Sequence, residues 1–271
     1  MDDGKSYNKA MIASYSVRTA AESSAYMLHL LKPDMHVLDV GSGPGTISLD
    51  LAAHVPQGKL TGIDASGMAV EAATELGKKR GMTNVSFIKG DALKLPFDDN
   101  TFDIVHCHQV LGHLPGQEEE PGPVRGLKEM RRVCKPGGFV CAREVEWSSF
   151  VVYPDTPGTV ESLNLLGKLQ KHGGKSVAGG RGKEFARRAG FTASDVSISA
   201  ATVTYSTADE LEWWGQTMAS RLEASNSRAK GVELGFITEE EGAKMPQAWR
   251  DWAGNEDAFS CRFDGQLICK K

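Results

Sequence analysis

The segment Val37-Leu38-Asp39-Val40-Gly41-Ser42-Gly43-Pro44-Gly45-Thr46 constrains the fold more than any other part of the chain. A short apolar run leads directly into a turn with glycines at alternate positions, and Ile47, Leu51 and Val55 then recur at helical spacing. Glycine adopts backbone angles closed to other residues and lets a ligand approach the main chain, because it has no Cβ. The segment therefore predicts a strand, a ligand-holding turn, and a helix whose first N–H groups face the ligand.

A second short strand, Lys59 to Ile63, ends at Asp64, about twenty residues after the turn. At that place in such a unit a carboxylate can accept hydrogen bonds from both hydroxyls of a ribose. The turn and the carboxylate together indicate a cofactor that contains adenosine. A helix N-cap is the alternative role for Asp64.

The glycine spacing distinguishes between adenosine cofactors. A dinucleotide fingerprint reads G-x-G-x-x-G and leaves room for a pyrophosphate. Here the third glycine comes one residue early, as Gly41, Gly43 and Gly45, and the stretch resembles motif I of the class I S-adenosylmethionine-dependent methyltransferases. An NAD-dependent oxidoreductase of the same fold and a purely structural glycine turn are the alternatives.

Length and composition limit the classes of protein. The chain has 271 residues, of which 40% are hydrophobic, and a net charge of -4. This length buries the core of one large domain, so we expect a single domain over residues 1–271. No basic stripe favours a nucleic-acid partner, and no run approaches the roughly eighteen apolar residues of a membrane span.

The five cysteines are odd in number and lack C-x-x-C spacing, which indicates reduced thiols. The charged N-terminus has no apolar segment of signal-peptide length. We therefore expect a cytoplasmic protein. No metal site is expected, and the sequence carries no signal for the oligomeric state.

Strands and helices alternate along the first half of the chain. The pattern predicts a helix over residues 15–31, and strands over 85–88, 102–107 and 139–143. Such alternation predicts an open parallel sheet with ligands at the carboxyl ends of its strands. Every motif named above lies at one of those ends.

Beyond Trp147 the alternation is interrupted by a helical stretch and a glycine-rich run over 173–182, which indicates an insertion with a lid or hinge. Thr207 and Thr238 each stand three residues before a glutamate, the spacing of a capping box, and open two further helices. An alternating strand over 258–269 ends the chain. The expected parts are 1–34 (N-terminal lid helices), 35–146 (cofactor-binding core), 147–182 (insertion and lid) and 183–271 (sheet completion and substrate-pocket helices).

The chain resembles small-molecule methyltransferases of the ubiquinone/menaquinone-biosynthesis type, especially the branch common in fungi and actinobacteria. Four stretches carry the resemblance: Arg18-Thr19-Ala20 with Ala25-Tyr26-Met27-Leu28; the glycine turn; Asn84-Val85-Ser86-Phe87 with Gly90-Asp91-Ala92 and Leu95-Pro96-Phe97; and His108-Gln109-Val110-Leu111-Gly112-His113-Leu114 with Arg132-Val133-Cys134-Lys135-Pro136-Gly137-Gly138. Together they cover about residues 7 to 145. The order and spacing of four motifs are more specific than any one of them.

The resemblance implies an α/β, Rossmann-like class I methyltransferase fold. Its seven-stranded sheet is mostly parallel with an antiparallel last strand, helices cover both faces, and the N-terminal helix and the insertion after the fifth strand form a lid. The cofactor-binding residues that the resemblance implies are Tyr15, Arg18, Gly41, Ser42, Gly43, Asp64, Ala65, Asp91, Ala92, His108 and Gln109.

The resemblance also implies roles for these residues. The backbone of Gly41 to Gly43 would lie against the methionine part of the cofactor, and Asp64 would bind the ribose. Asp91 would accept from the adenine amino group, and the N–H of Ala92 would face the ring. The main chain at His108 and the side chain of Gln109 would close the methionine end, and Tyr7, Tyr15 and Arg18 would fold over the cofactor. Turn capping is the alternative role for Asp91.

Candidate catalytic residues are His108, His113 and Glu146. A general base is needed only if the nucleophile arrives protonated. A histidine in an apolar segment is often a hydrogen-bonded core residue, which is the alternative for both histidines. Glu144 and Glu146 follow a strand's carboxyl end and can act as base, substrate ligand or structural residue. Gly112 stands where the family frequently has a bulkier residue, which would enlarge the pocket.

The predicted function is methyl transfer from S-adenosyl-L-methionine to an O, N, S or C atom of a small, partly apolar metabolite, of a secondary-metabolite or quinone-like kind. The expected partner is thus a small-molecule methyl acceptor. Two further alternatives are a regulator or scaffold that keeps the cofactor fold without methylating, and a protein that uses the cofactor as an aid to another reaction.

Overall fold

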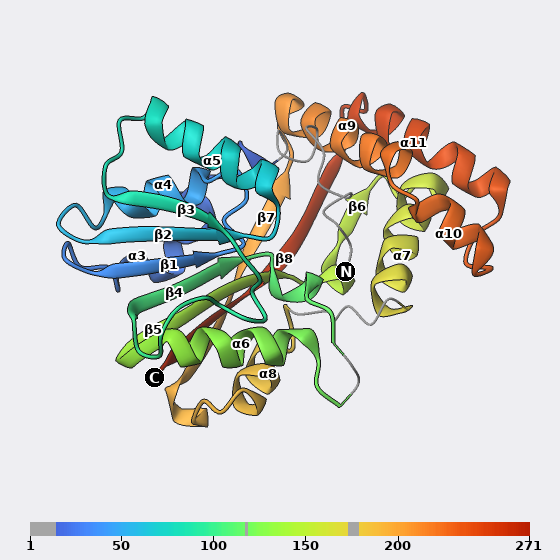
Figure 1. Cartoon of the computed structure of the whole chain (residues 1–271). Coiled ribbons are helices and arrows are strands. Elements are labelled where there is room, and N and C mark those ends of the chain that lie inside the picture. Colours follow the sequence, from blue (N-terminus) through green and yellow to red (C-terminus); the bar gives the residue numbers. More distant parts are fainter. Residues whose placement is uncertain (1–14, 117–118, 173–178) are drawn as a thin grey trace.

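The computed structural model describes residues 15–116, 119–172 and 179–271, and its strands form one sheet of eight (Figure 1). The order is β3-β2-β1-β4-β5-β8-β6, with β7 paired to the other edge of β8. The strands are β1 (His36–Val40), β2 (Lys59–Asp64), β3 (Val85–Lys89), β4 (Phe102–His108), β5 (Cys134–Val145), β6 (Val151–Tyr153), β7 (Val196–Tyr205) and β8 (Phe259–Lys270). Strands β1 to β5 run parallel, because a helix or loop crossover returns the chain to the same end each time.

Strand β8 is the antiparallel strand on which the second half of the sheet is built. Its residues 264–270 pair with β5, and residues 259–261 pair with β6 along the same edge. Strand β7 pairs along the other edge of β8 over residues 196–205. The predicted mostly parallel sheet with an antiparallel last strand is confirmed, and β6, a short strand of the insertion, is added to the seven expected strands.

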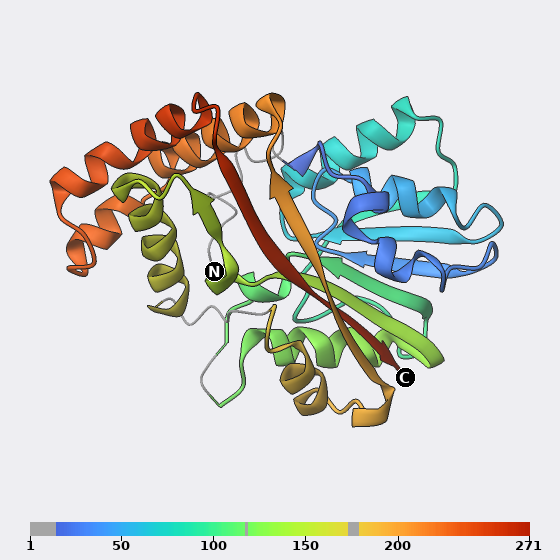
Figure 2. The same cartoon turned by 180° about the vertical axis from the view of Figure 1, so that it is seen from behind.

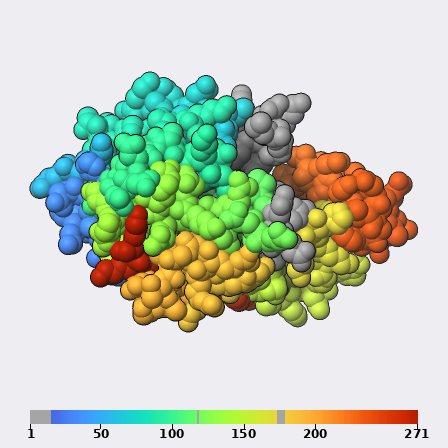
Figure 3. Space-filling view, turned by 60° about the horizontal axis from the view of Figure 1, so that its bottom comes forward, coloured from blue at the N-terminus to red at the C-terminus, as the bar shows by residue number. Residues whose placement is uncertain are grey.

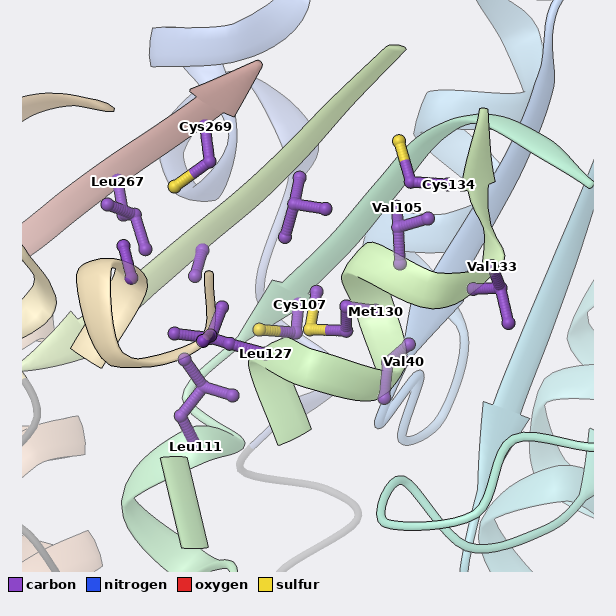
Figure 4. Packing of buried hydrophobic residues seen from close by; sticks show 14 of the residues in the cluster. Val40, Val105, Cys107, Leu111, Leu127, Met130, Val133, Cys134, Leu267 and Cys269 are labelled. Carbon is purple, nitrogen blue, oxygen red and sulfur yellow. The ribbon is translucent and has the colours of Figure 1, made fainter. Parts of the chain in front are cut away.

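Helices cover both faces of the parallel part of the sheet (Figures 1 and 2). One face carries α2 (Ala20–Ser23), α3 (Ala25–Leu28), α4 (Thr46–Ala53) and α5 (Gly67–Lys79); the other carries α6 (Gly122–Val133) and α8 (Gly182–Arg188). Alternation along the strands sends Val37 to the first face and Leu38 to the second. Each face of the sheet thus packs a hydrophobic core against its helices. In Figure 4, Leu127 and Met130 of α6 lie against Cys107 of β4, inside the larger of the two cores.

The helix ends follow the local sequence. The side chain of Ser66 accepts a hydrogen bond from the N–H of Ala69 and caps α5, which ends before Gly81 at φ +66°. Both predicted capping boxes are confirmed, with Thr207 and Thr238 opening α9 (Ala208–Ala224) and α11 (Glu239–Ala253).

The helix predicted over residues 15–31 is wrong as a single element. It is divided into α2 and α3 at Ser24, whose φ of -130° and ψ of 10° are not helical. The Ser24 hydroxyl lies 3.0 Å from Nε2 of His106, and Nδ1 of His106 lies 2.8 Å from the Asp39 carboxylate. This buried contact with the strands overrides the helical pattern of the segment.

A separate helical lobe, to which the insertion contributes α7, forms one end of the molecule (Figure 3). It consists of α7 (Pro157–His172), α9, α10 (Ser227–Glu233) and α11, with a core of its own. Trp249 is fully buried there, and its indole N–H donates to the Ser162 hydroxyl across 2.7 Å. Within the described ranges, every helix falls short of the length and apolar character that crossing a membrane requires.

Candidate active site

The glycine turn and Asp64 are joined directly at the carboxyl ends of β1 and β2. The backbone N–H groups of Gly41 and Ser42 donate to the carbonyl of Ile63 across 2.7 and 3.1 Å. The N–H of Gly43 donates to Asp64 Oδ2 across 2.9 Å. Gly41, Gly43 and Gly45 have φ values of +71°, +53° and +84°, the left-handed region that favours glycine.

Two of these glycines also occupy spaces that no side chain fits. A Cβ on Gly41 would lie 2.2 Å from Cγ2 of Val110, and a Cβ on Gly45 would lie 2.7 Å from Cβ of Ala73. The turn is therefore pressed between α5 and the segment that follows β4. This close approach brings the predicted methionine-side wall next to residues 108–113.

The Asp64 carboxylate is oriented by the backbone on both of its oxygens. Oδ1 accepts a hydrogen bond from the N–H of Ser66 across 2.8 Å, while Oδ2 accepts the hydrogen bond from the N–H of Gly43. Burial raises the pKa of Asp64 despite these hydrogen bonds. The N-cap of α5 is Ser66, so the capping alternative for Asp64 is wrong. Ala65 lies exposed between them.

Asp91 and Ala92 lie just past the end of β3, beside β2 at the same edge of the sheet. The exposed Asp91 accepts a hydrogen bond from the N–H of Leu93 at Oδ1, across 2.8 Å. The turn-capping role foreseen for Asp91 is therefore present, and its adenine role stays a prediction.

Gln109 lies past β4 in a left-handed backbone conformation, with a φ of +56°. Its N–H donates to the carbonyl of Arg143 across 2.8 Å, and its side-chain oxygen accepts from Nη2 of Arg18 across 2.7 Å. The Arg18 guanidinium lies 4.5 Å from the centre of the Tyr15 ring. Arg18, Tyr15 and Gln109 thus meet past the end of β4. Tyr7 falls outside the described residues.

His108 is buried at the end of β4, and its Nδ1 has no hydrogen-bond partner among the described residues. Burial, reinforced by Arg18, holds the pKa of His108 well below its usual value, so the imidazole is neutral near pH 7. His113 lies exposed in a 3-10 turn, Leu111–His113.

The two glutamates after β5 have different positions. The Glu144 carboxylate accepts from the N–H groups of Val110, Leu111 and Gly112, and burial raises its pKa to about 7. The carboxylate therefore holds the start of the turn that carries His113.

Glu146 instead accepts from Ser148 through Oε1 and from the N–H of Gly180 through Oε2, across 2.8 Å. It is not among the residues that line the cavity described next. This geometry ties the insertion to the sheet and does not support Glu146 as a base.

A cavity of about 650 Å³ lies between the carboxyl ends of β4 and β5 and the helical lobe. Its lining includes His108, Gln109 and Gly112 at and after the end of β4, Tyr205 at the end of β7, and Trp214 of α9. The Tyr205 and Trp214 rings stack with their centres 4.6 Å apart. Trp214 therefore both packs in the core of the lobe and lines the cavity.

Sequence reasoning missed a buried ionic cluster in the same cavity wall. The Asp264 carboxylate accepts from Nε of Arg143 across 3.1 Å and from Nε of Arg262 across 3.0 Å. All three side chains are buried. The available signal was the charged residues at alternate positions of the last strand, which place both charges on one face.

The residues at the strand ends fit S-adenosylmethionine. The buried Ser42 hydroxyl has no partner among the described residues, and the turn admits no Cβ at Gly41. A carboxylate fixed beside such a turn suits a ribose. Among the described residues, no group of three or more histidine, cysteine or acidic side chains is arranged to hold a metal ion.

Comparison with known proteins identifies the family. Residues 31–177 match a family model described as a methyltransferase domain. The chain is 35% identical to the uncharacterized methyltransferase C1B3.06c of Schizosaccharomyces pombe, over 95% of this chain and 92% of that protein. It is 32% identical to a protein of Aspergillus luteorubrus named probable methyltransferase ltbC, over 98% and 95% of the two chains.

A shorter likeness covers the cofactor-binding part. Demethylmenaquinone methyltransferase of Staphylococcus aureus is 42% identical over 118 residues, which are 43% of this chain and 45% of that protein. Among solved structures, a methyltransferase-like protein of Bacillus halodurans (BH2331) aligns over 91% of this chain and 97% of its own with a TM-score of 0.59 and 19% identity, a likeness of fold. The family match, the two full-length relatives and the geometry at the strand ends together show that the chain belongs to the methyltransferase family, as a class I enzyme that depends on S-adenosylmethionine.

Proposed function

We propose that this enzyme methylates an O, N, S or C atom of a small, partly apolar metabolite, of a secondary-metabolite or quinone-like kind. The observation that carries the proposal is the cavity of about 650 Å³, which is of the size that small ligands occupy. It borders His108 and Gln109, at the edge of the sheet where the cofactor-binding motifs end. Its aromatic wall suits an acceptor with an apolar part.

We propose a cofactor pose that the arrangement of the strand ends supports. The main chain of Gly41 to Gly43 lies against the methionine part, and Asp64 binds the ribose hydroxyls. Asp91 accepts a hydrogen bond from the adenine amino group, the N–H of Ala92 faces the ring, and Ala65 lies beside the ribose. These roles are supported by the glycines at positions where a Cβ would clash and by the Asp64 carboxylate, which backbone hydrogen bonds orient.

The methionine end is closed by His108 and Gln109, with Arg18 and Tyr15 above them. Among the described residues, the Arg18 guanidinium donates to the neutral side chain of Gln109, and we propose that its charge binds the methionine carboxylate. The ring of Tyr15 lies against the guanidinium and holds it in place.

When bound, S-adenosylmethionine supplies a methyl group on a sulfonium, which is already a strong electrophile. The protein's contribution is then alignment of the acceptor in a pocket from which water is excluded, and orientation alone accounts for several kcal/mol. Gly112 leaves room on the sheet side, and Trp147 and Phe150 from the insertion contribute to the wall. We infer that segments 147–182 and 183–271 act as lid and substrate pocket of one domain.

Proton removal is assigned to His108 where the acceptor requires it. The neutral imidazole can take a proton at Nδ1, which has no partner among the described residues. His113 lines the same cavity from its exposed turn and is the second candidate.

The proposal is tested by incubating the protein with labelled S-adenosylmethionine and a metabolite extract of its source, then identifying the labelled product by mass spectrometry. We expect one labelled small molecule and a matching release of S-adenosylhomocysteine. Tight cofactor binding with no product from any extract would instead support the alternative of a regulatory protein that keeps the fold.

A further inference from the structure

The inner face of β8 is polar, which is unusual for a strand in the middle of a sheet. Ser260, Arg262 and Asp264 alternate on the buried side, while Phe259 and Phe263 are 37% and 39% exposed on the other. Alternation in a half-buried strand ordinarily turns the apolar side chains inward. A buried row of polar groups is costly unless each finds a partner or a ligand.

The charges on this face do not cancel. One carboxylate, Asp264, pairs with two guanidinium groups, those of Arg143 and Arg262, which leaves one positive charge within this three-residue cluster. Glu144 is directed to backbone N–H groups of its own. The remaining acids that line the cavity are exposed: Glu22, Asp209 and Glu210.

Arg262 is held rigidly in this position by an aromatic frame. Its Nη1 donates to the Tyr205 hydroxyl across 3.1 Å, and its guanidinium carbon lies 5.4 Å from the centre of the Phe150 ring and 5.9 Å from that of Trp214. Trp214 is 95% buried, and its indole N–H has no acceptor among the described residues. The Arg262 guanidinium and the unsatisfied indole N–H of Trp214 thus lie beside the stacked rings of Tyr205 and Trp214.

We propose that the methyl acceptor is a planar aromatic anion, with its carboxylate or ionised hydroxyl bound at the Arg262 guanidinium and its ring against Trp214 and Tyr205. This inference rests on the proposed function, because it names the acceptor class for the same cavity. With Arg18 assigned to the methionine carboxylate, an anionic acceptor is the group that balances Arg262. A fixed guanidinium binds oxyanions with charge-assisted hydrogen bonds.

The test is calorimetry on the full chain saturated with S-adenosylhomocysteine, using matched probes. The first pair is 2-naphthoate and neutral 2-naphthamide, the second ionised 4-nitrophenol and 4-nitroanisole, and cyclohexanecarboxylate tests the aromatic requirement. We expect at least one aromatic anion to bind roughly tenfold or more tightly than its neutral partner and than cyclohexanecarboxylate. The pair that responds distinguishes a carboxylate from an ionised hydroxyl.

Arg262→Gln should abolish this preference. Tyr205→Phe keeps the charge of Arg262 but removes the hydroxyl that accepts from it, so this variant should reduce the preference several-fold. It provides the test if Arg262→Gln does not fold. The matched control is Arg250→Gln. Arg250 lies on α11, pairs with Glu223 and does not line the cavity, so this variant should keep the full preference.

Equal binding of anionic and neutral probes by the wild type, or an unchanged preference in both Arg262→Gln and Tyr205→Phe, would overturn the inference. Binding of S-adenosylhomocysteine, measured first in the same titration, separates the two proposals. Its presence without an anion preference refutes only the acceptor class, whereas its absence refutes the proposed function.

Discussion

The Asp64 carboxylate accepts the N–H of Gly43 across 2.9 Å, so one side chain both shapes the glycine turn and faces the predicted ribose site. Replacing Asp64 by Ala should weaken the binding of S-adenosylhomocysteine by roughly a hundredfold, because at least two hydrogen bonds to a charged group are lost. Calorimetry measures the affinity. Asp99→Ala, an exposed carboxylate paired with Arg132, is the control and should bind normally. Unchanged affinity in Asp64→Ala would refute the site.

Gly41→Ala should destabilise the protein by about 2 to 4 kcal/mol, because the new Cβ meets Val110 and the backbone has a positive φ. Urea unfolding measures the loss. Gly81→Ala is a matched control: its φ is +66° but no atom lies within 4 Å of the new Cβ. It should cost about 1 kcal/mol, the backbone contribution alone. Equal costs at the two positions would contradict the packing described for the turn.

Glu144 should make stability depend on pH. Its folded-state pKa is about 7, above the ordinary value of 4.5, because burial disfavours the charged carboxylate. Between these values the folded protein holds a proton that the unfolded chain releases. Stability should therefore fall as the pH rises from about 4.5 to 7, by up to about 3 kcal/mol, and change little from this source above it.

The measurement is the free energy of unfolding across this pH range for the wild type and for Glu144→Gln, which carries no titrating group. The difference between the two proteins isolates the contribution of Glu144 from those of other carboxylates. A difference that does not vary between pH 4.5 and 7.5 would contradict the raised pKa.

Histidine replacement should affect activity little if the acceptor is an anion. An ionised nucleophile needs no general base, so His108→Gln and His113→Gln should each keep kcat within about tenfold of the wild type. The assay is release of S-adenosylhomocysteine with the acceptor found in the extract. A loss of a hundredfold or more, with a changed pH profile of kcat, would assign the proton transfer to that histidine and favour a protonated acceptor.

The cofactor half of the site was readable from the sequence because each motif lies next to a strand end. In a parallel sheet these ends meet at one edge, so Gly41, Asp64, Asp91 and Gln109 had to come together. The capping boxes at Thr207 and Thr238 were equally readable, since they depend only on residues three apart.

The acceptor half depended on contacts between distant segments. Arg143 and Asp264 are 121 residues apart, and only the pairing of β5 with β8 brings them together. The division of the N-terminal helix at Ser24 has the same origin, a contact with His106 82 residues away.

The sequence by itself therefore determined the order of strands and helices, the glycine turn and the family, because these follow from local periodicity and from backbone positions that only glycine accepts. Only the tertiary structure decided which face of β8 is buried. The polar side chains of β8 point inward because that face lines a cavity, where their charges can contact one another and a ligand. The twelve residues of the strand do not themselves indicate which face lies against the cavity.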